Sequence, residues 1–127
     1  NGVQVMPPAE IKFIDFAADK PCIVGYNAKW QDNSHEYLNT PRTFDFADID
    51  RALLADLTAM ARRCWDVLGL RGYARVDFRV DNNGCPWVLE VNANPCLSPD
   101  AGFIAAAGRG GVEIKEVVRR LIQAAES

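Results

Sequence analysis

The chain has 127 residues, of which 49% are hydrophobic and 24% are charged, a balance typical of one globular domain or part of one. Its formal net charge of -3 disfavours binding to nucleic acid or to an anionic membrane, because neither would be attracted electrostatically. No run approaches the roughly 20 apolar residues of a membrane helix, and the start lacks a signal-peptide pattern, so we expect a cytoplasmic protein. Four cysteines without a C-x-x-C pair, beside a single histidine, indicate neither a zinc site nor a disulfide framework.

The first third of the sequence predicts short strands. Apolar runs at residues 2–6, 11–16 and 23–26 are separated by turn residues such as Pro7-Pro8, which predicts a small antiparallel patch. The polar residues 31–42 predict a surface loop. Because the chain opens at Asn1, without Met, and runs directly into the first apolar stretch, we expect it to be a piece of a longer protein.

Three helices follow from the apolar spacing. Between residues 46 and 68 apolar side chains recur every three or four positions, and Gly69 is placed to end that helix. Residues 101–107 and 112–125 predict two shorter helices, separated by the glycine-rich residues 108–111. With the strands, this pattern predicts an α+β protein in which an antiparallel sheet packs on helices.

A β-hairpin is predicted at residues 73–91, where two alternating runs flank Asn83-Gly84. A two-residue type I′ turn there would place Asp77 opposite Glu90 and Arg75 opposite Asn92, on one face. The other face would be apolar and free to pack on the long helix, with the pairs Val80–Trp87, Phe78–Leu89 and Val76–Val91.

The polar face of this hairpin predicts a cation site. Two opposed carboxylates about 5 Å apart repel each other unless a cation lies between them, and carboxylate plus amide oxygens suit Mg²⁺. Arg75, beside them, would meet an anionic group. Two alternatives stay open: Arg75 and Arg79 could simply neutralise the carboxylates on a solvated face, and a three-residue loop would shift the register by one.

These residues resemble a known family. Residues 72–78 (Gly-Tyr-Ala-Arg-Val-Asp-Phe), 81–84 and 89–95 (Leu-Glu-Val-Asn-Ala-Asn-Pro) are similar to the C-terminal subdomain of ATP-grasp ligases, most closely the D-alanine–D-alanine ligase group. Upstream, residues 6–11 and 26–30 (Tyr-Asn-Ala-Lys-Trp), and the stretch from Glu36 to Pro41, are also similar. The resemblance covers roughly residues 3–125 and implies the C-terminal lobe of an ATP-grasp fold.

The resemblance implies ATP and two Mg²⁺ ions, or Mn²⁺, as cofactors. Asp77, Glu90 and Asn92 would be the metal ligands, with Asn92 also at the nucleotide. A substrate carboxylate would attack the γ-phosphate to give an acyl phosphate and ADP, and an amine would then displace phosphate. Arg75 would support the developing oxyanion. Leu89 would pack on adenine and Lys29 would lie near the phosphates; their alternatives are a core leucine and a surface lysine.

The loop after the hairpin departs from the family pattern. Where the dipeptide ligases have a glycine whose amide helps to form the oxyanion hole, this chain has Cys96, for which we expect only the backbone N–H to act. Asn94, Ser98 and Asp100 are the candidates for contacting the amine substrate. The departure leaves D-alanine open as the substrate, so a ligase for a different acid and amine is one alternative reading.

The implied enzyme is larger than this chain. The glycine-rich loop lobe and the N-terminal substrate domain of the family have no counterpart in residues 1–127. We therefore expect the chain alone to be inactive, with the missing lobes as its partners beside ATP and small carboxylate and amine substrates. The other alternative is a non-catalytic remnant that binds a nucleotide, a metal or a partner protein.

Overall fold

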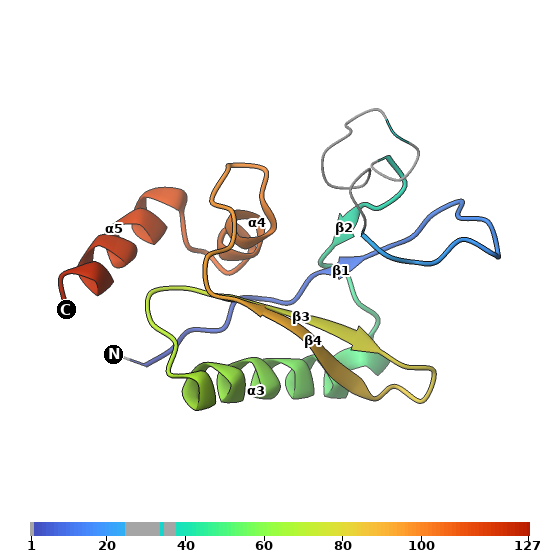
Figure 1. Cartoon of the computed structure of the whole chain (residues 1–127), viewed down its shortest axis with the longest axis horizontal. Helices are drawn as coiled ribbons and strands as arrows, with labels where there is room; N and C mark the ends of the chain where they lie inside the picture. The colour runs from blue at the N-terminus through green and yellow to red at the C-terminus, as the bar shows by residue number, and fades with distance from the viewer. Residues whose placement is uncertain (1, 25–33, 35–37) are drawn as a thin grey trace. The chain divides into compact units, whose positions relative to one another are not determined.

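The computed structural model describes residues 2–24, 34 and 38–127 (Figure 1). Their elements, in chain order, are β1 (Glu10–Ile11), β2 (Arg42–Thr43), the short 3-10 helix η1 (Asp48–Asp50), α3 (Arg51–Leu68), β3 (Arg75–Val80), β4 (Pro86–Asn92), α4 (Gly102–Arg109) and α5 (Ile114–Ala125). Helices and two antiparallel sheets confirm the α+β prediction. None of the helices among these residues is long and apolar enough to cross a membrane.

The chain divides into two compact units, of which the smaller comprises Ala9–Asp45. Its two-residue strands pair Glu10 with Thr43 and Ile11 with Arg42. The backbone N–H groups of Lys12 and Ile14 continue this pairing, since they donate to the carbonyls of Pro41 and Asn39 at 3.0 and 2.8 Å. The first strand of this sheet is therefore shorter than the run predicted at residues 11–16. Its partner strand begins at the end of residues 31–42, which were predicted to be a loop.

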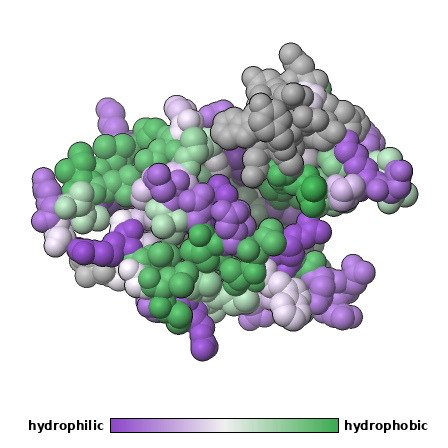
Figure 2. All heavy atoms as spheres, in the orientation of Figure 1, coloured by the Kyte–Doolittle hydropathy of each residue, from purple (hydrophilic) through white to green (hydrophobic). Residues whose placement is uncertain are grey.

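The larger unit comprises Asn1–Pro8 and Phe46–Ser127. Its longest helix, α3, ends where predicted, because Gly69 adopts φ 60 and donates to the carbonyl of Asp66. The predicted start at residue 46 was wrong, since the first turn is η1 and α3 begins at Arg51. Met60 and Cys64 of α3 and Val88 and Val91 of β4 line an open apolar groove. Figure 2 shows apolar side chains gathered over this part of the larger unit.

The core of the larger unit lies between α4 and α5. Ala107, Val112 and Val117 are its buried hydrophobic residues, and Met6 and Phe103 pack against them. The prediction of a strand at residues 2–6 was wrong, because this segment contacts helices: Met6 joins the core and Gln4 accepts a hydrogen bond of 2.8 Å from Arg120.

Both C-terminal helices were predicted with displaced bounds. α4 continues through Gly108 to Arg109, although residues 108–111 were expected to break it. It ends where the Gly110 N–H donates to the Ala106 carbonyl. α5 begins two residues later than expected, because Val112 donates its N–H back to the Ala107 carbonyl and is buried in the core.

Candidate functional site

The hairpin loop differs from the predicted type I′ turn. The Asp81 N–H donates to the Cys85 carbonyl at 3.0 Å, so the loop has three residues, and Gly84, with φ 75, has its only positive φ. The Asp81 carboxylate stabilises this loop by accepting bonds from the Asn83 and Cys85 N–H groups, both at 2.9 Å, and from the Trp87 indole at 3.1 Å. These bonds lower the pKa of Asp81, with the Trp87 bond the largest cause. Sequence reasoning gave Asp81 no role.

A β-bulge corrects the register that this loop sets. Near the loop the strands pair Val80 with Pro86 and Phe78 with Val88, so the predicted Val80–Trp87 and Phe78–Leu89 pairs were wrong. The register then shifts between Asp77 and Phe78, with Leu89 as the extra residue of β4. Beyond the bulge, from Asp77 to Arg75, the strands pair as predicted.

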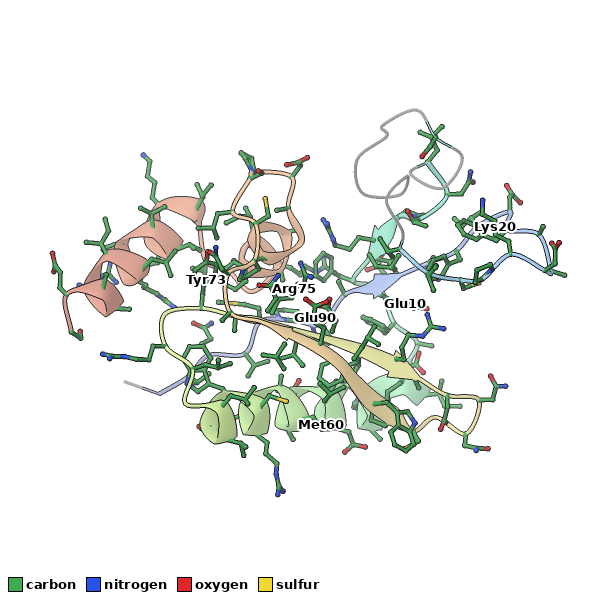
Figure 3. All side chains as sticks on the ribbon, viewed as in Figure 1. Glu10, Lys20, Met60, Tyr73, Arg75 and Glu90 are labelled. Atoms are coloured by element: carbon green, nitrogen blue, oxygen red, sulfur yellow. The ribbon has the colours of Figure 1, made fainter. Side chains whose placement is uncertain are left out.

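The restored register gathers four predicted site residues on one face. Asp77 pairs with Glu90, and Arg75 pairs with Asn92. Residues two apart on a strand share a face, so all four side chains lie on the face opposite to Val76 and Val91. Val91 lines the groove with α3, which places the polar face away from that helix. Figure 3 shows Arg75 and Glu90 on this side of the hairpin, with Met60 on the α3 side.

Arg75 binds Asp77 through both carboxylate oxygens. Its Nε lies 2.7 Å from Asp77 Oδ1 and its Nη2 lies 2.9 Å from Oδ2. The side chains are 40% and 32% exposed. The hydrogen bonds to Asp77 raise the pKa of Arg75, burial opposes this, and the charges of Asp77 and Glu90 add to the rise. The alternative that arginines neutralise the carboxylates of this face is therefore met in part, since Arg75 pairs with Asp77.

The donor set fits a hard divalent cation. Asp77 and Glu90 are directly paired, which places their Cβ atoms about 5 Å apart, and Asn92 follows Glu90 on the same face. Two carboxylates and an amide are ligands typical of Mg²⁺. The residues that the structure describes contain no group of three or more His, Cys, Asp or Glu side chains that could hold a metal, so the donors at this hairpin are two carboxylates and one amide.

Tyr73 connects the start of β3 to the loop after β4. Its hydroxyl lies 2.7 Å from Asn94 Oδ1 and 3.1 Å from the Pro95 carbonyl oxygen. The Asn94 N–H in turn donates to Asn92 Oδ1 at 2.9 Å. Sequence reasoning missed Tyr73, because a hydrogen bond between residues 21 positions apart leaves no local signal.

Cys96 and Ser98 lie close together in the exposed loop, with Sγ and Oγ 3.2 Å apart. Hydrogen bonds from the Ser98 hydroxyl and backbone lower the pKa of Cys96, whereas the charge of Asp100 opposes this. Asp15 is the one non-glycine residue with positive φ in the described ranges, so Cys96 adopts a backbone angle that any residue tolerates.

Besides Asn92, two nucleotide contacts were predicted, Leu89 and Lys29, and the structure describes only one of them. Leu89 is 68% exposed, so it is not a core leucine. Lys29 lies outside the described residues, as do the similar segment 26–30 and Glu36. Arg75, Asp77, Glu90 and Asn92 thus form one group, and Asn94, Cys96, Ser98 and Asp100 lie on the loop that follows it.

Comparison with known proteins gives relatives over nearly the whole chain. A D-alanine–D-alanine ligase of Synechococcus sp. (strain JA-3-3Ab) is 37% identical over 120 residues, which are 94% of this chain and 34% of the relative. The ligase of Pelotomaculum thermopropionicum is 31% identical over 81% of this chain and 30% of its own length. The chain therefore spans about a third of the length of these relatives.

Solved structures of the Bacillus anthracis D-alanine–D-alanine ligase share the fold. One superposes with a TM-score of 0.63 at 23% identity, covering 95% of this chain and 36% of that one. A second, a complex with ATP, superposes with a TM-score of 0.62 at 22% identity, covering 70% and 30%. The family model described as the D-ala D-ala ligase C-terminus matches residues 3–123. The chain therefore belongs to the family of D-alanine–D-alanine ligase C-terminal domains and has the fold of an ATP-grasp C-terminal lobe.

Proposed function

We propose that residues 1–127 are the C-terminal ATP-grasp lobe of a ligase that uses ATP to join a carboxylate to an amine. The observation that carries the proposal is the pairing of Asp77 with Glu90 and of Arg75 with Asn92 on one face. The names of the relatives, D-alanine–D-alanine ligase, support the same reaction class. In that class a carboxylate attacks the γ-phosphate of ATP to give an acyl phosphate and ADP, and an amine then attacks the acyl carbon to form the amide and release phosphate.

Asp77, Glu90 and Asn92 would hold Mg²⁺ ions, two in number, or Mn²⁺ in their place. Their oxygens are the donors of the polar face, and Asn92 would thereby also serve the nucleotide. When bound, such ions neutralise charge on the phosphates during phosphoryl transfer. Both oxygens of Asp77 are bound by Arg75 in this structure.

Arg75 would stabilise anionic oxygen at the reacting centre. Its guanidinium presents several N–H donors in a fixed plane, which suits phosphate or a developing oxyanion. Leu89, exposed beside Glu90, would pack on the adenine ring. Lys29 would contact the phosphates.

The loop after β4 would bind the substrates. The Cys96 N–H would donate to the oxyanion, which its backbone angle permits. Ser98 and Asp100, both exposed, would contact the amine, and Asn94 would contribute from the start of the loop. D-alanine is the substrate in the names of the relatives, and we propose it for this protein as the first acid and amine to assay.

Catalysis would require the missing N-terminal lobes. The chain covers about a third of its relatives, so we expect it to release no ADP from ATP by itself. ADP release by the isolated chain above a control without protein would contradict this expectation.

The test of the proposed site is calorimetric titration of Mn²⁺ into the chain, with and without ADP. We expect ADP to strengthen the binding and Asp77→Asn to abolish it. Asp56→Asn, which removes an equal charge from the exposed surface of α3, should bind as the wild type does. Equal binding by the wild type and Asp77→Asn would contradict the site.

A further inference from the structure

Tyr73 is held from two sides. Its ring packs edge-on against Phe103 of α4, with centroids 5.2 Å apart and an angle of 71° between the planes. Phe103 itself packs against the buried residues between α4 and α5. The ring therefore has a fixed support, two residues before β3 begins at Arg75. Figure 3 shows Tyr73 and Arg75 near each other at this end of the hairpin.

The hydroxyl of Tyr73 reaches the first residues after β4. Asn94 Oδ1 and the Pro95 carbonyl oxygen are both acceptors, at 2.7 and 3.1 Å, so they share the one hydroxyl proton, with the shorter bond to Asn94. Pro95 is buried and Asn94 is exposed, so the two contacts tie Tyr73 to the point where the loop leaves the protein interior. Asn94 is thus restrained through its side chain by a residue 21 positions earlier.

The restraint passes from Asn94 to Asn92. The Asn94 N–H can donate only to the oxygen of the Asn92 amide, so the 2.9 Å bond selects which end of that amide is the carbonyl. An amide oxygen has two lone pairs, so one remains for a cation beside the paired carboxylates. The bond therefore orients the group that the proposed metal site requires.

We propose that Tyr73 is a positioning residue of the metal site, acting through Asn94 on Asn92. This inference rests on the proposed function, because it assumes that Asn92 is a ligand. It assigns the side-chain oxygen of Asn94 to Tyr73 instead of to the substrate. The phenol hydroxyl, and not the ring, carries the role.

The test separates the hydroxyl from the ring. Tyr73→Phe keeps the contact with Phe103 and removes only the donor, whereas Phe103→Leu alters the support and keeps the hydroxyl. Mn²⁺ affinity is measured by calorimetry, the exchange rate of the Asn94 N–H by NMR, and global stability by urea unfolding. Groups that orient a metal ligand typically change metal affinity by about 10-fold to 100-fold.

We expect Tyr73→Phe to weaken Mn²⁺ binding by about 10-fold and to speed exchange of the Asn94 N–H by at least a similar factor. We expect Phe103→Leu to lower the urea midpoint more than Tyr73→Phe does, while Mn²⁺ affinity stays within about twofold. This combination would support positioning, because a merely structural residue would change stability and affinity together.

Three results would overturn the inference, and they are distinguishable. If the wild type binds Mn²⁺ through Asp77 and Tyr73→Phe binds within about twofold of it, the positioning role alone is refuted. If the wild type shows no Mn²⁺ binding that depends on Asp77, the proposed function and the role of Tyr73 are both refuted. Losses of affinity that follow stability in both variants would also refute positioning.

Discussion

The ion pair between Arg75 and Asp77 makes a quantitative prediction. Two charge-assisted hydrogen bonds, of 2.7 and 2.9 Å, join side chains that are 40% and 32% exposed. Exposed pairs contribute roughly 0–1 kcal/mol and well-ordered bidentate pairs contribute more, so we expect a coupling energy of about 1 kcal/mol. A double-mutant cycle of Arg75→Met and Asp77→Ala measures it.

The two single variants should not be equivalent, because Glu90 lies opposite Asp77. Two carboxylates about 5 Å apart repel by about 1 kcal/mol in water and roughly 3 kcal/mol at an effective dielectric of about 20. Glu90 is exposed, so the lower figure applies. Arg75→Met loses the pair and keeps the repulsion that the wild type already has, so it should cost about 1 kcal/mol. Asp77→Ala loses both the attraction and the repulsion and should cost close to zero.

Urea unfolding at low ionic strength is the assay. With a slope of about 1–2 kcal/mol per molar urea, the Arg75→Met midpoint should fall by roughly 0.5–1 M. Arg79→Met, which removes the same charge from the same face two residues beyond Asp77, should cost less. Millimolar Mg²⁺ should restore part of the stability of Arg75→Met, because a cation on Asp77 and Glu90 removes their repulsion. A coupling energy below about 0.3 kcal/mol, or Asp77→Ala less stable than Arg75→Met, would refute the reasoning.

Two further predictions concern the packing of the larger unit. Gly110→Ala should destabilise the chain by about 1 kcal/mol, since a Cβ there would lie 3.0 Å from Met6 Sδ and 3.1 Å from Pro7 Cδ. Gly108 lies in α4, and a Cβ there would meet nothing within 4 Å, so Gly108→Ala should stabilise the chain by about 0.5–1 kcal/mol. Urea midpoints of the two variants that move in the same direction would contradict this packing. Because the pKa of Asp81 is lowered, its stabilisation of the hairpin loop should be complete above about pH 5 and disappear as the pH falls through the lowered value. The indole N–H signal of Trp87 reports that bond by NMR; it should titrate in the wild type and stay constant in Asp81→Asn.

Local chemistry explains which parts of the fold the sequence predicted well. Gly69 and the apolar spacing before it determine the end of α3, because both signals act within a few residues. The prediction of a strand at residues 2–6 failed for the opposite reason. Its β-like composition is outweighed by Met6 in the core and by the bond from Arg120 to Gln4, which are contacts between distant parts of the chain. The role of Tyr73 was missed for the same reason, because it depends on a contact with a residue that is distant in the sequence.

The polar face of the hairpin was predicted correctly from a loop that was predicted wrongly, and burial explains why. Continuing the register of the three-residue loop would pair Asp77 with Leu89 and place Glu90 opposite Val76, on the face that packs on α3. Burying that carboxylate and exposing Val91 would cost more than one disrupted step of the ladder. The bulge at Leu89 absorbs the mismatch, so the alternation of apolar and polar residues determines the register at the open end of the strands. The pairing of Asp77 with Glu90 therefore depends on which side chains must face α3, and it is insensitive to the turn that joins the strands.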